Sequence, residues 1–238
     1  MRRLVGALAA LVSLCLIASS CLGEDRDGSI AIMVPSSFTD ITGEIDRTGE
    51  YDIEWIIASS NRLLRQLEDG AAAQVLITAD QETMDRAVEE GLVSGVVAVV
   101  ATNRLVFAVA PDNPGAISSL DDLARDDLLL GVCADEVPCG RLADEAARAL
   151  GFEMAADTEE PNVRSLALKI ARGELDGGLV YATDALTFGL DTVADDQLSA
   201  FVNEYPAASV DGSSTGVVAL LRSPEGQELL HARGFGPP

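Results

Sequence analysis

Three turns of the chain place polar residues where a predicted strand passes into a predicted helix. They are residues 35–40 (Pro-Ser-Ser-Phe-Thr-Asp), 58–63 (Ala-Ser-Ser-Asn-Arg-Leu) and 137–140 (Val-Pro-Cys-Gly). The first N–H groups of a helix have no partner within it and lie at the positive end of its dipole. Serine hydroxyls add donors that can rotate to suit a ligand. Three such turns meeting at one cleft could bind an anion without a cationic side chain, although each serine alone is more simply a helix N-cap.

Other kinds of chemistry find little support in the sequence. The only histidine is His231, and no nucleophile elbow, Walker loop or cluster of metal ligands occurs. We therefore expect a protein that is not an enzyme and needs no cofactor. The formal net charge of −23 and the pI of about 4.1 argue against a nucleic-acid partner. Acidic pairs such as residues 121–122 and 195–196 are interpreted as solvated faces and not as calcium sites, because the spacing of an EF-hand calcium loop is not present.

Strand and helix signals alternate along the chain, which favours an α/β fold with helices packed on mostly parallel sheets. Short apolar runs predict strands, and apolar residues at helical spacing predict the helices between them. The predicted strands are residues 30–34, 53–57, 75–77, 105–110, 128–132 and 179–181, and helical spacing occurs at residues 63–67, 84–92, 142–150 and 163–172. We place a division of the chain near Ala110, after the fourth of these strands.

The first residues have the pattern of an exported protein. Two arginines precede an apolar run from Leu4 to Ile17, and small residues then lead to Cys21. This pattern predicts a secretory signal peptide over residues 1–20, because the run is too short to cross a hydrocarbon core of roughly 30 Å. The residues before Cys21 resemble a lipobox. We therefore expect acylation of Cys21, with plain cleavage as the alternative, and a polar tether over residues 21–28.

Two cysteines remain for the folded domain, Cys133 and Cys139. They form an even pair in a compartment where disulfides persist, and their C-x5-C spacing suits a small stapled loop rather than a zinc site. We predict a disulfide between Cys133 and Cys139, with two free buried thiols as the alternative.

Six segments carry a recognisable family pattern in the same order along the chain. They are residues 34–40, 58–71, 76–85, 137–140, 162–164 and 180–185. In these segments, and over nearly all of its mature length, the chain resembles the periplasmic molybdate-binding proteins of ABC transporters. The resemblance implies a two-lobed, type II periplasmic-binding-protein fold with mixed, mostly parallel sheets flanked by helices and a ligand cleft between the lobes. It implies that lobe 1 comprises residues 29–110 and 206–238, and that lobe 2 comprises residues 111–205.

The resemblance also implies a set of ligand contacts. Carried over by position, Ser37 and Ser60 donate hydroxyl and main-chain N–H bonds, Cys139 and Val163 donate through their main-chain N–H groups, and Tyr181 donates through its phenol. Ser37, Ser60 and Tyr181 would contact the oxygens of a molybdate ion and not its metal atom. The simpler interpretations are a core tyrosine at Tyr181 and a core valine at Val163, although a core side chain at Val163 is compatible with an N–H that faces the cleft.

The function that follows is capture of molybdate or tungstate and delivery to the membrane subunits of an ABC importer. The protein would act as a monomer, outside the cytoplasm, on the outer face of the cytoplasmic membrane or in the periplasm, tethered by a lipid at Cys21. Two alternatives share the fold: a binding protein for sulfate or thiosulfate, and a sensory or structural lipoprotein that does not bind tightly. Arg62 follows Ser60 where the family has small polar residues, so Arg62 could approach the anion. The short spacing between Ser37 and Ser60 suggests shortened helices.

Overall fold

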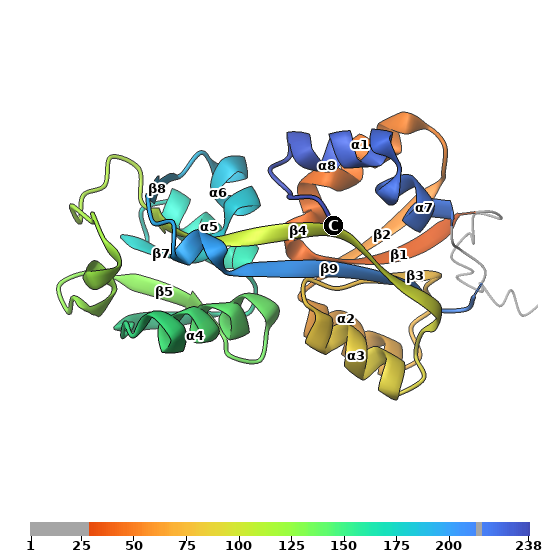
Figure 1. Cartoon of the computed structure of the whole chain (residues 1–238), viewed down its shortest axis with the longest axis horizontal. Coiled ribbons are helices and arrows are strands. Elements are labelled where there is room, and N and C mark those ends of the chain that lie inside the picture. Colours follow the sequence, from red (N-terminus) through yellow and green to blue (C-terminus); the bar gives the residue numbers. More distant parts are fainter. Residues whose placement is uncertain (1–28, 213–215) are drawn as a thin grey trace, which may run out of the picture.

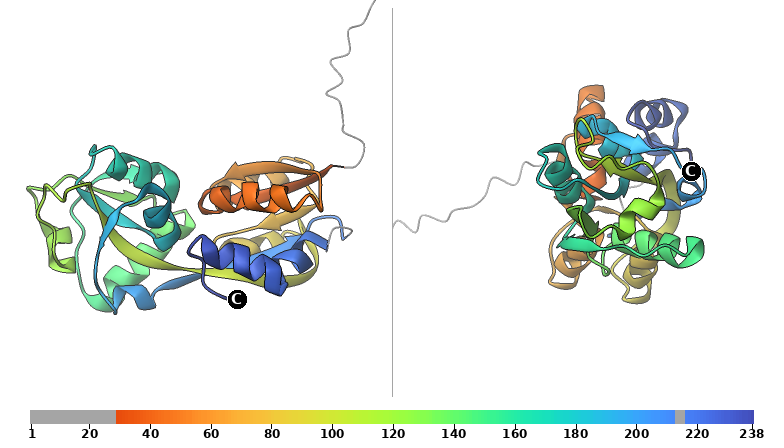
Figure 2. Two further views of the ribbon diagram at one scale, coloured as in Figure 1. Left: turned by 90° about the horizontal axis from the view of Figure 1, so that it is seen from above. Right: turned by 90° about the vertical axis from the view of Figure 1, so that its left-hand side faces the viewer.

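The computed structural model describes residues 29–212 and 216–238, which form two lobes joined by two long strands (Figure 1). The predicted signal peptide, Cys21 and the whole predicted tether lie outside the described residues. Lobe 1 contains the start and the end of the described chain, and lobe 2 contains its middle. The left view of Figure 2 shows the two lobes side by side, with the two connecting strands running from one to the other.

The sheet of lobe 1 has the strand order β2-β1-β3-β9-β4. These strands are β2 (Ile53–Ala58), β1 (Ile30–Pro35), β3 (Val75–Ile77), β9 (Val202–Ser209) and β4 (Ser94–Val109). β1 pairs in parallel with β2 and β3, whereas β9 runs antiparallel to β3 and β4. The sheet is therefore mixed, and its parallel part consists of the three strands nearest the start of the chain.

Helices cover both faces of this sheet. In Figure 1, α1 (Thr39–Thr48), α7 (Gly216–Arg222) and α8 (Pro224–Ala232) lie above it, and α2 (Ser60–Glu68) and α3 (Gln81–Glu89) lie below. Successive side chains of a strand point to opposite faces, so β1 contributes to two cores. Ile32 and Val34 pack in the core that contains α1, α7 and α8, and Met33 packs in the core that contains α2 and α3.

The sheet of lobe 2 has the strand order β4-β7-β5-β6, with β8 on the other edge of β4. These strands are β5 (Leu130–Cys133), β6 (Ala156–Glu160), β7 (Gly177–Tyr181) and β8 (Asp191–Val193). Its helices are α4 (Pro138–Leu150), α5 (Val163–Ala171) and α6 (Ala182–Phe188). Three 3-10 turns, η1 (Ser36–Phe38), η2 (Leu120–Ala124) and η3 (Leu198–Ala200), complete the described elements. A single core formed by residues from β4 to η3 fills this lobe.

The boundary between the lobes differs from the predicted division near Ala110. β4 pairs with β9 up to Arg104 and with β7 from Leu105 onward, so one strand belongs to both sheets. The chain returns in β9, which starts at Val202, earlier than the predicted return at residue 206. The polar residues Asn103 and Arg104 interrupt the apolar pattern, which is why the sequence showed only the second half of β4 as a strand. At about 3.3 Å per residue, a strand of this length spans roughly 50 Å and reaches across both lobes.

The structure contains a disulfide between Cys133 and Cys139, whose Cα atoms lie 5.8 Å apart. This bond ties the end of β5 to the first turn of α4. Among the helices of residues 29–212 and 216–238, none is long and apolar enough to cross a membrane.

Candidate functional site

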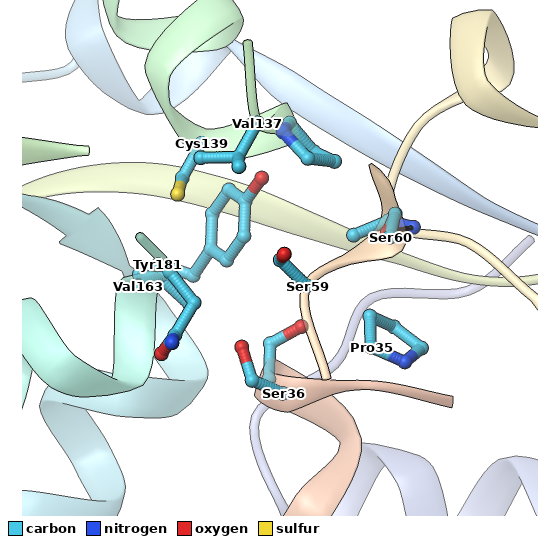
Figure 3. Close-up of a pocket in the computed structure, with 12 residues that line it drawn as sticks. Pro35, Ser36, Ser59, Ser60, Val137, Cys139, Val163 and Tyr181 are labelled. Carbon is cyan, nitrogen blue, oxygen red and sulfur yellow. Dashed lines mark hydrogen bonds between the residues drawn. The ribbon is translucent and has the colours of Figure 1, made fainter. Parts of the chain in front are cut away.

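A small pocket lies where the two lobes meet. Both lobes contribute equally to its wall, as Figure 3 shows. Its residues are Pro35, Ser36, Ser37, Ser59, Ser60 and Ala79 from lobe 1, and Val137, Pro138, Cys139, Asn162, Val163 and Tyr181 from lobe 2. The structure thus brings together all five residues that the sequence predicts as ligand contacts.

The two serine pairs of lobe 1 lie at the ends of neighbouring parallel strands. β1 ends at Pro35 and continues into the turn η1, whose first two residues are Ser36 and Ser37. β2 ends at Ala58, and α2 begins at Ser60. The N-cap positions of η1 and α2 make no side-chain capping bond. Pro35 occupies the N-cap position of η1 and Ser59 that of α2, so no serine hydroxyl caps either element.

The wall from lobe 2 begins with the N-terminus of α4. Pro138 occupies the first turn, where a missing N–H costs nothing, and Cys139 follows it. A Cβ at Gly140 would lie 2.0 Å from the carbonyl oxygen of Ala134. Only glycine therefore lets the helix approach the end of β5 this closely, and the Cys133–Cys139 bond holds the same two segments together.

Val163 and Tyr181 complete the wall from lobe 2. Asn162 caps α5 by accepting a bond from the N–H of Ser165 at 2.9 Å, so Val163 is the first residue of the helix. The side chain of Val163 lies in the core of lobe 2. Tyr181 is the last residue of β7, and its phenol accepts a bond of 2.5 Å from the side-chain amide of Asn203. Tyr181 is thus a buried tyrosine with a hydrogen-bonded hydroxyl that also lines the pocket.

The lining residues carry no lysine, arginine, histidine or carboxylate side chain. Burial raises the pKa of the Tyr181 phenol well above its usual value, so this group keeps its proton and remains a donor. Arg62 is exposed on α2 and does not line the pocket, so the expectation that it approaches the anion is wrong for this structure. A neutral wall that includes serine hydroxyls and several helix N-termini favours an anion.

Two arginines of lobe 2, Arg164 and Arg141, form ion pairs with lobe 1 beside the pocket. Arg164 of α5 donates to both carboxylate oxygens of Asp40 on α1, at 2.6 and 3.0 Å, and Thr187 of α6 donates to the same carboxylate at 2.8 Å. Burial raises the pKa of Asp40, but the bonds from Arg164 and Thr187 outweigh it and lower this pKa below its ordinary value.

The second arginine, Arg141 of α4, pairs with Asp80 at the N-cap of α3 and with Glu82 in its first turn. Arg141 donates through Nε to Asp80 at 2.9 Å and through a terminal nitrogen to Thr83 at 2.9 Å. The side-chain amide of Asn61 also donates to the main-chain oxygen of Glu136 in lobe 2. The two lobes are therefore in direct contact around the pocket. Sequence reasoning did not find these pairs, because the partners are far apart along the chain.

Behind the pocket lies a buried polar group of residues on the connecting strands and on α6. The hydroxyl of Ser37 lies 2.7 Å from that of Tyr205, and the side-chain amide of Asn103 donates to the hydroxyls of Tyr205 and Thr183 at 3.3 and 2.8 Å. Burial raises the pKa of the neighbouring Asp184 to about 7. The only sign of this buried polar group in the sequence is that polar residues interrupt apolar strands.

The site offers hydrogen-bond donors and lacks the groups of a catalytic or metal centre. Within the described part of the chain, no three histidine, cysteine, aspartate or glutamate residues are grouped so that they could hold a metal ion. Nothing in the wall pairs a nucleophile with a general base, as covalent catalysis requires. The arrangement suits reversible binding of a small anion.

Known proteins resemble this chain in sequence and in architecture. Residues 38–236 match the family model of the bacterial extracellular solute-binding proteins. The chain is 33% identical over 217 residues to the molybdate-binding protein ModA of Mycobacterium tuberculosis, covering 87% of this chain and 83% of that one.

Solved structures show the same fold. The periplasmic molybdate-binding protein of Azotobacter vinelandii has a TM-score of 0.70 at 15% identity, covering 88% of this chain and 99% of that one. The sulfate-binding protein SubI of M. tuberculosis has a TM-score of 0.73 at 17% identity, covering 88% and 87%. The predicted type II periplasmic-binding-protein fold is confirmed. The chain belongs to the bacterial extracellular solute-binding proteins and, within them, to the molybdate-binding protein family of ABC transporters.

Proposed function

We propose that this protein captures molybdate or tungstate outside the cytoplasm and delivers it to the membrane subunits of an ABC importer, without catalysing a reaction. The observation that carries the proposal is the pocket between the lobes, which combines helix N-termini and hydroxyls with a wall free of charged side chains. The 33% identity to a protein named for molybdate binding supports this choice of ligand.

The ligand would be held by neutral donors. Ser37 and Ser60 donate from lobe 1, Tyr181 donates from lobe 2, and the N–H groups of Cys139 and Val163 at two helix starts complete the set. Hydrogen bonds to a charged group contribute roughly 1.5–3 kcal/mol each, so several of them offset much of the cost of removing a dianion from water. Distant carboxylates of this acidic chain are screened beyond about 8–10 Å, and they oppose binding only weakly.

Closure of the lobes over the anion would form the Asp40–Arg164 and Asp80–Arg141 pairs and create a surface that the importer recognises. The N-terminal pattern supports export and a lipid anchor at Cys21, which would keep the protein near the membrane. We further propose that the protein acts as a monomer, since one chain supplies both walls of the pocket.

A thermal unfolding experiment on residues 28–238 tests the proposal, with molybdate, tungstate, sulfate and phosphate added in turn. A ligand at about one hundred times its Kd adds roughly 2.7 kcal/mol to the free energy of unfolding. We expect a rise in Tm with molybdate and tungstate only, and its loss in a Ser37→Ala, Ser60→Ala double variant.

Sulfate or thiosulfate is the second candidate ligand, because a protein named for sulfate binding has the same fold. A rise in Tm with sulfate instead of molybdate would support it. No shift with any of the four anions would contradict oxyanion binding and favour the sensory or structural alternative.

A further inference from the structure

The hydroxyl of Ser60 has a fixed role in its bond to the protein. It accepts a hydrogen bond of 3.0 Å from the main-chain N–H of Ala79. A main-chain N–H can only donate. The hydroxyl proton of Ser60 is therefore not used in this bond and is free to be donated to a bound ligand.

The phenol of Tyr181 likewise accepts a hydrogen bond from the protein and keeps its own proton unused. The side-chain nitrogen of Asn203 lies 2.5 Å from the Tyr181 oxygen and 3.4 Å from the carbonyl oxygen of Pro138. A carbonyl oxygen can only accept, so the group of Asn203 that faces both atoms is its NH2. The Tyr181 oxygen thus accepts from Asn203, and its own proton is free. Burial raises the pKa of Tyr181, so that proton is retained.

Ser37 has a comparable partner in Tyr205. The Tyr205 hydroxyl accepts from the side-chain amide of Asn103 at 3.3 Å and lies 2.7 Å from the Ser37 hydroxyl. Since Tyr205 accepts from Asn103, its proton is available to Ser37. Either hydroxyl can donate across this contact, and when Tyr205 donates, Ser37 accepts and has its own proton free. Asn203 and Tyr205 are two residues apart on β9, so their side chains lie on the same face of the strand.

We propose that Asn203 and Tyr205 are positioning residues that hold Tyr181 and Ser37 as hydrogen-bond donors toward the ligand. The inference rests on the proposed function and adds to it residues that do not line the pocket. Because β9 connects the lobes, one strand sets the donor direction on both walls. Asn203 acts on lobe 2 through Tyr181, and Tyr205 acts on lobe 1 through Ser37.

Double-mutant cycles test the proposal. The Kd for molybdate is measured by isothermal titration calorimetry for Asn203→Leu, Tyr181→Phe and the double variant. A second cycle uses Tyr205→Phe, Ser37→Ala and their double variant. We expect each single variant to raise Kd roughly tenfold, the effect of about one net hydrogen bond to a charged group. Asn203→Leu should then have no further effect in the Tyr181→Phe background, and Tyr205→Phe none in the Ser37→Ala background.

The controls separate positioning from folding. Glu204→Gln, on the exposed face of β9 between the two residues, should leave Kd unchanged. Thermal unfolding without ligand shows whether each variant folds, and Asn203→Ala replaces Asn203→Leu if the larger side chain does not fit. Additive losses within either cycle, or a wild-type Kd in Asn203→Leu and Tyr205→Phe, would overturn the proposal. If the wild-type protein itself binds none of the anions, the proposed function fails instead.

Discussion

Removing the Asp40–Arg164 pair should weaken ligand binding without lowering the stability of the ligand-free protein. The pair joins α1 of lobe 1 to α5 of lobe 2, and Thr187 adds a third bond to the same carboxylate. These bonds can form only when the lobes are together. A substitution such as Asp40→Asn should therefore destabilise the closed, ligand-bound state and leave an open state unaffected.

The size of the effect follows from exposure. The Arg164 and Asp40 side chains are 26% and 24% exposed, between the fully exposed and the fully buried case. Exposed ion pairs contribute about 0.2–1 kcal/mol, and hydrogen bonds to buried charges about 1.5–3 kcal/mol. For a bidentate ion pair of intermediate exposure we take a contribution of about 1.5 kcal/mol, and its loss raises the Kd for molybdate roughly tenfold.

Calorimetric titration at pH 7 of Asp40→Asn, Arg164→Gln and the double variant measures the coupling of the two side chains. The matched control is Asp144→Asn, which removes an ion pair with Arg148 inside α4 and should not change Kd. The pKa of Asp40 is lowered, so its contribution is present above the ordinary value of 3.8 and is lost only as the pH falls below it. An unchanged Kd in Asp40→Asn, together with a lower Tm of the ligand-free protein, would refute the reasoning, because the pair would then support folding rather than closure.

Four further predictions concern single features of the site and its surroundings. Replacing Cys133 and Cys139 by serine should lower the free energy of unfolding by roughly 2 kcal/mol, as expected for so short a loop, measured by urea titration. Gly140→Ala should lower the free energy of unfolding by about 1–3 kcal/mol through overpacking, and it should also raise the Kd for molybdate. Substitution of a solvent-exposed glycine is the control and should not change this Kd. Burial raises the pKa of Asp184 to about 7. As the pH rises from about 4 to about 7, the Tm of the wild-type protein should therefore fall relative to that of Asp184→Asn. Parallel curves of Tm against pH for the two proteins would contradict a neutral carboxyl group at Asp184. Arg62→Ala should change the Kd for molybdate less than twofold, because this side chain is exposed and does not line the pocket.

The elements at the start of the chain were predictable because their signals are local. β1, β2 and β3 begin at the residues that the apolar runs indicate. β6 was missed because Ala156–Glu160 is an acidic edge strand with no apolar face. β9 was missed because Pro206 interrupts it, and proline within a run argues against a central strand.

The candidate site was predictable only in part, for a different reason. The turns that contain Ser37, Ser60 and Cys139 follow from strand ends and helix starts, which are local patterns. Their convergence on one pocket came from the family resemblance. The residues that hold the site in place depend on contacts between separate segments of the chain, and Arg164 is 124 residues from Asp40. No periodicity in a single sequence reports such contacts.

The sharing of β4 and β9 between the lobes has a consequence for the order in which the protein can fold. Lobe 2 is one continuous stretch, residues 105–201, and lobe 1 is assembled from the chain on either side of it. β9 lies between β3 and β4 in the sheet of lobe 1, so this sheet is incomplete until residues 202–209 have been synthesised. During synthesis, lobe 2 can therefore complete its core first, whereas β1, β2 and β3 must wait for a strand that is made after it. The inserted lobe can thus complete its fold before the lobe that encloses it in the sequence.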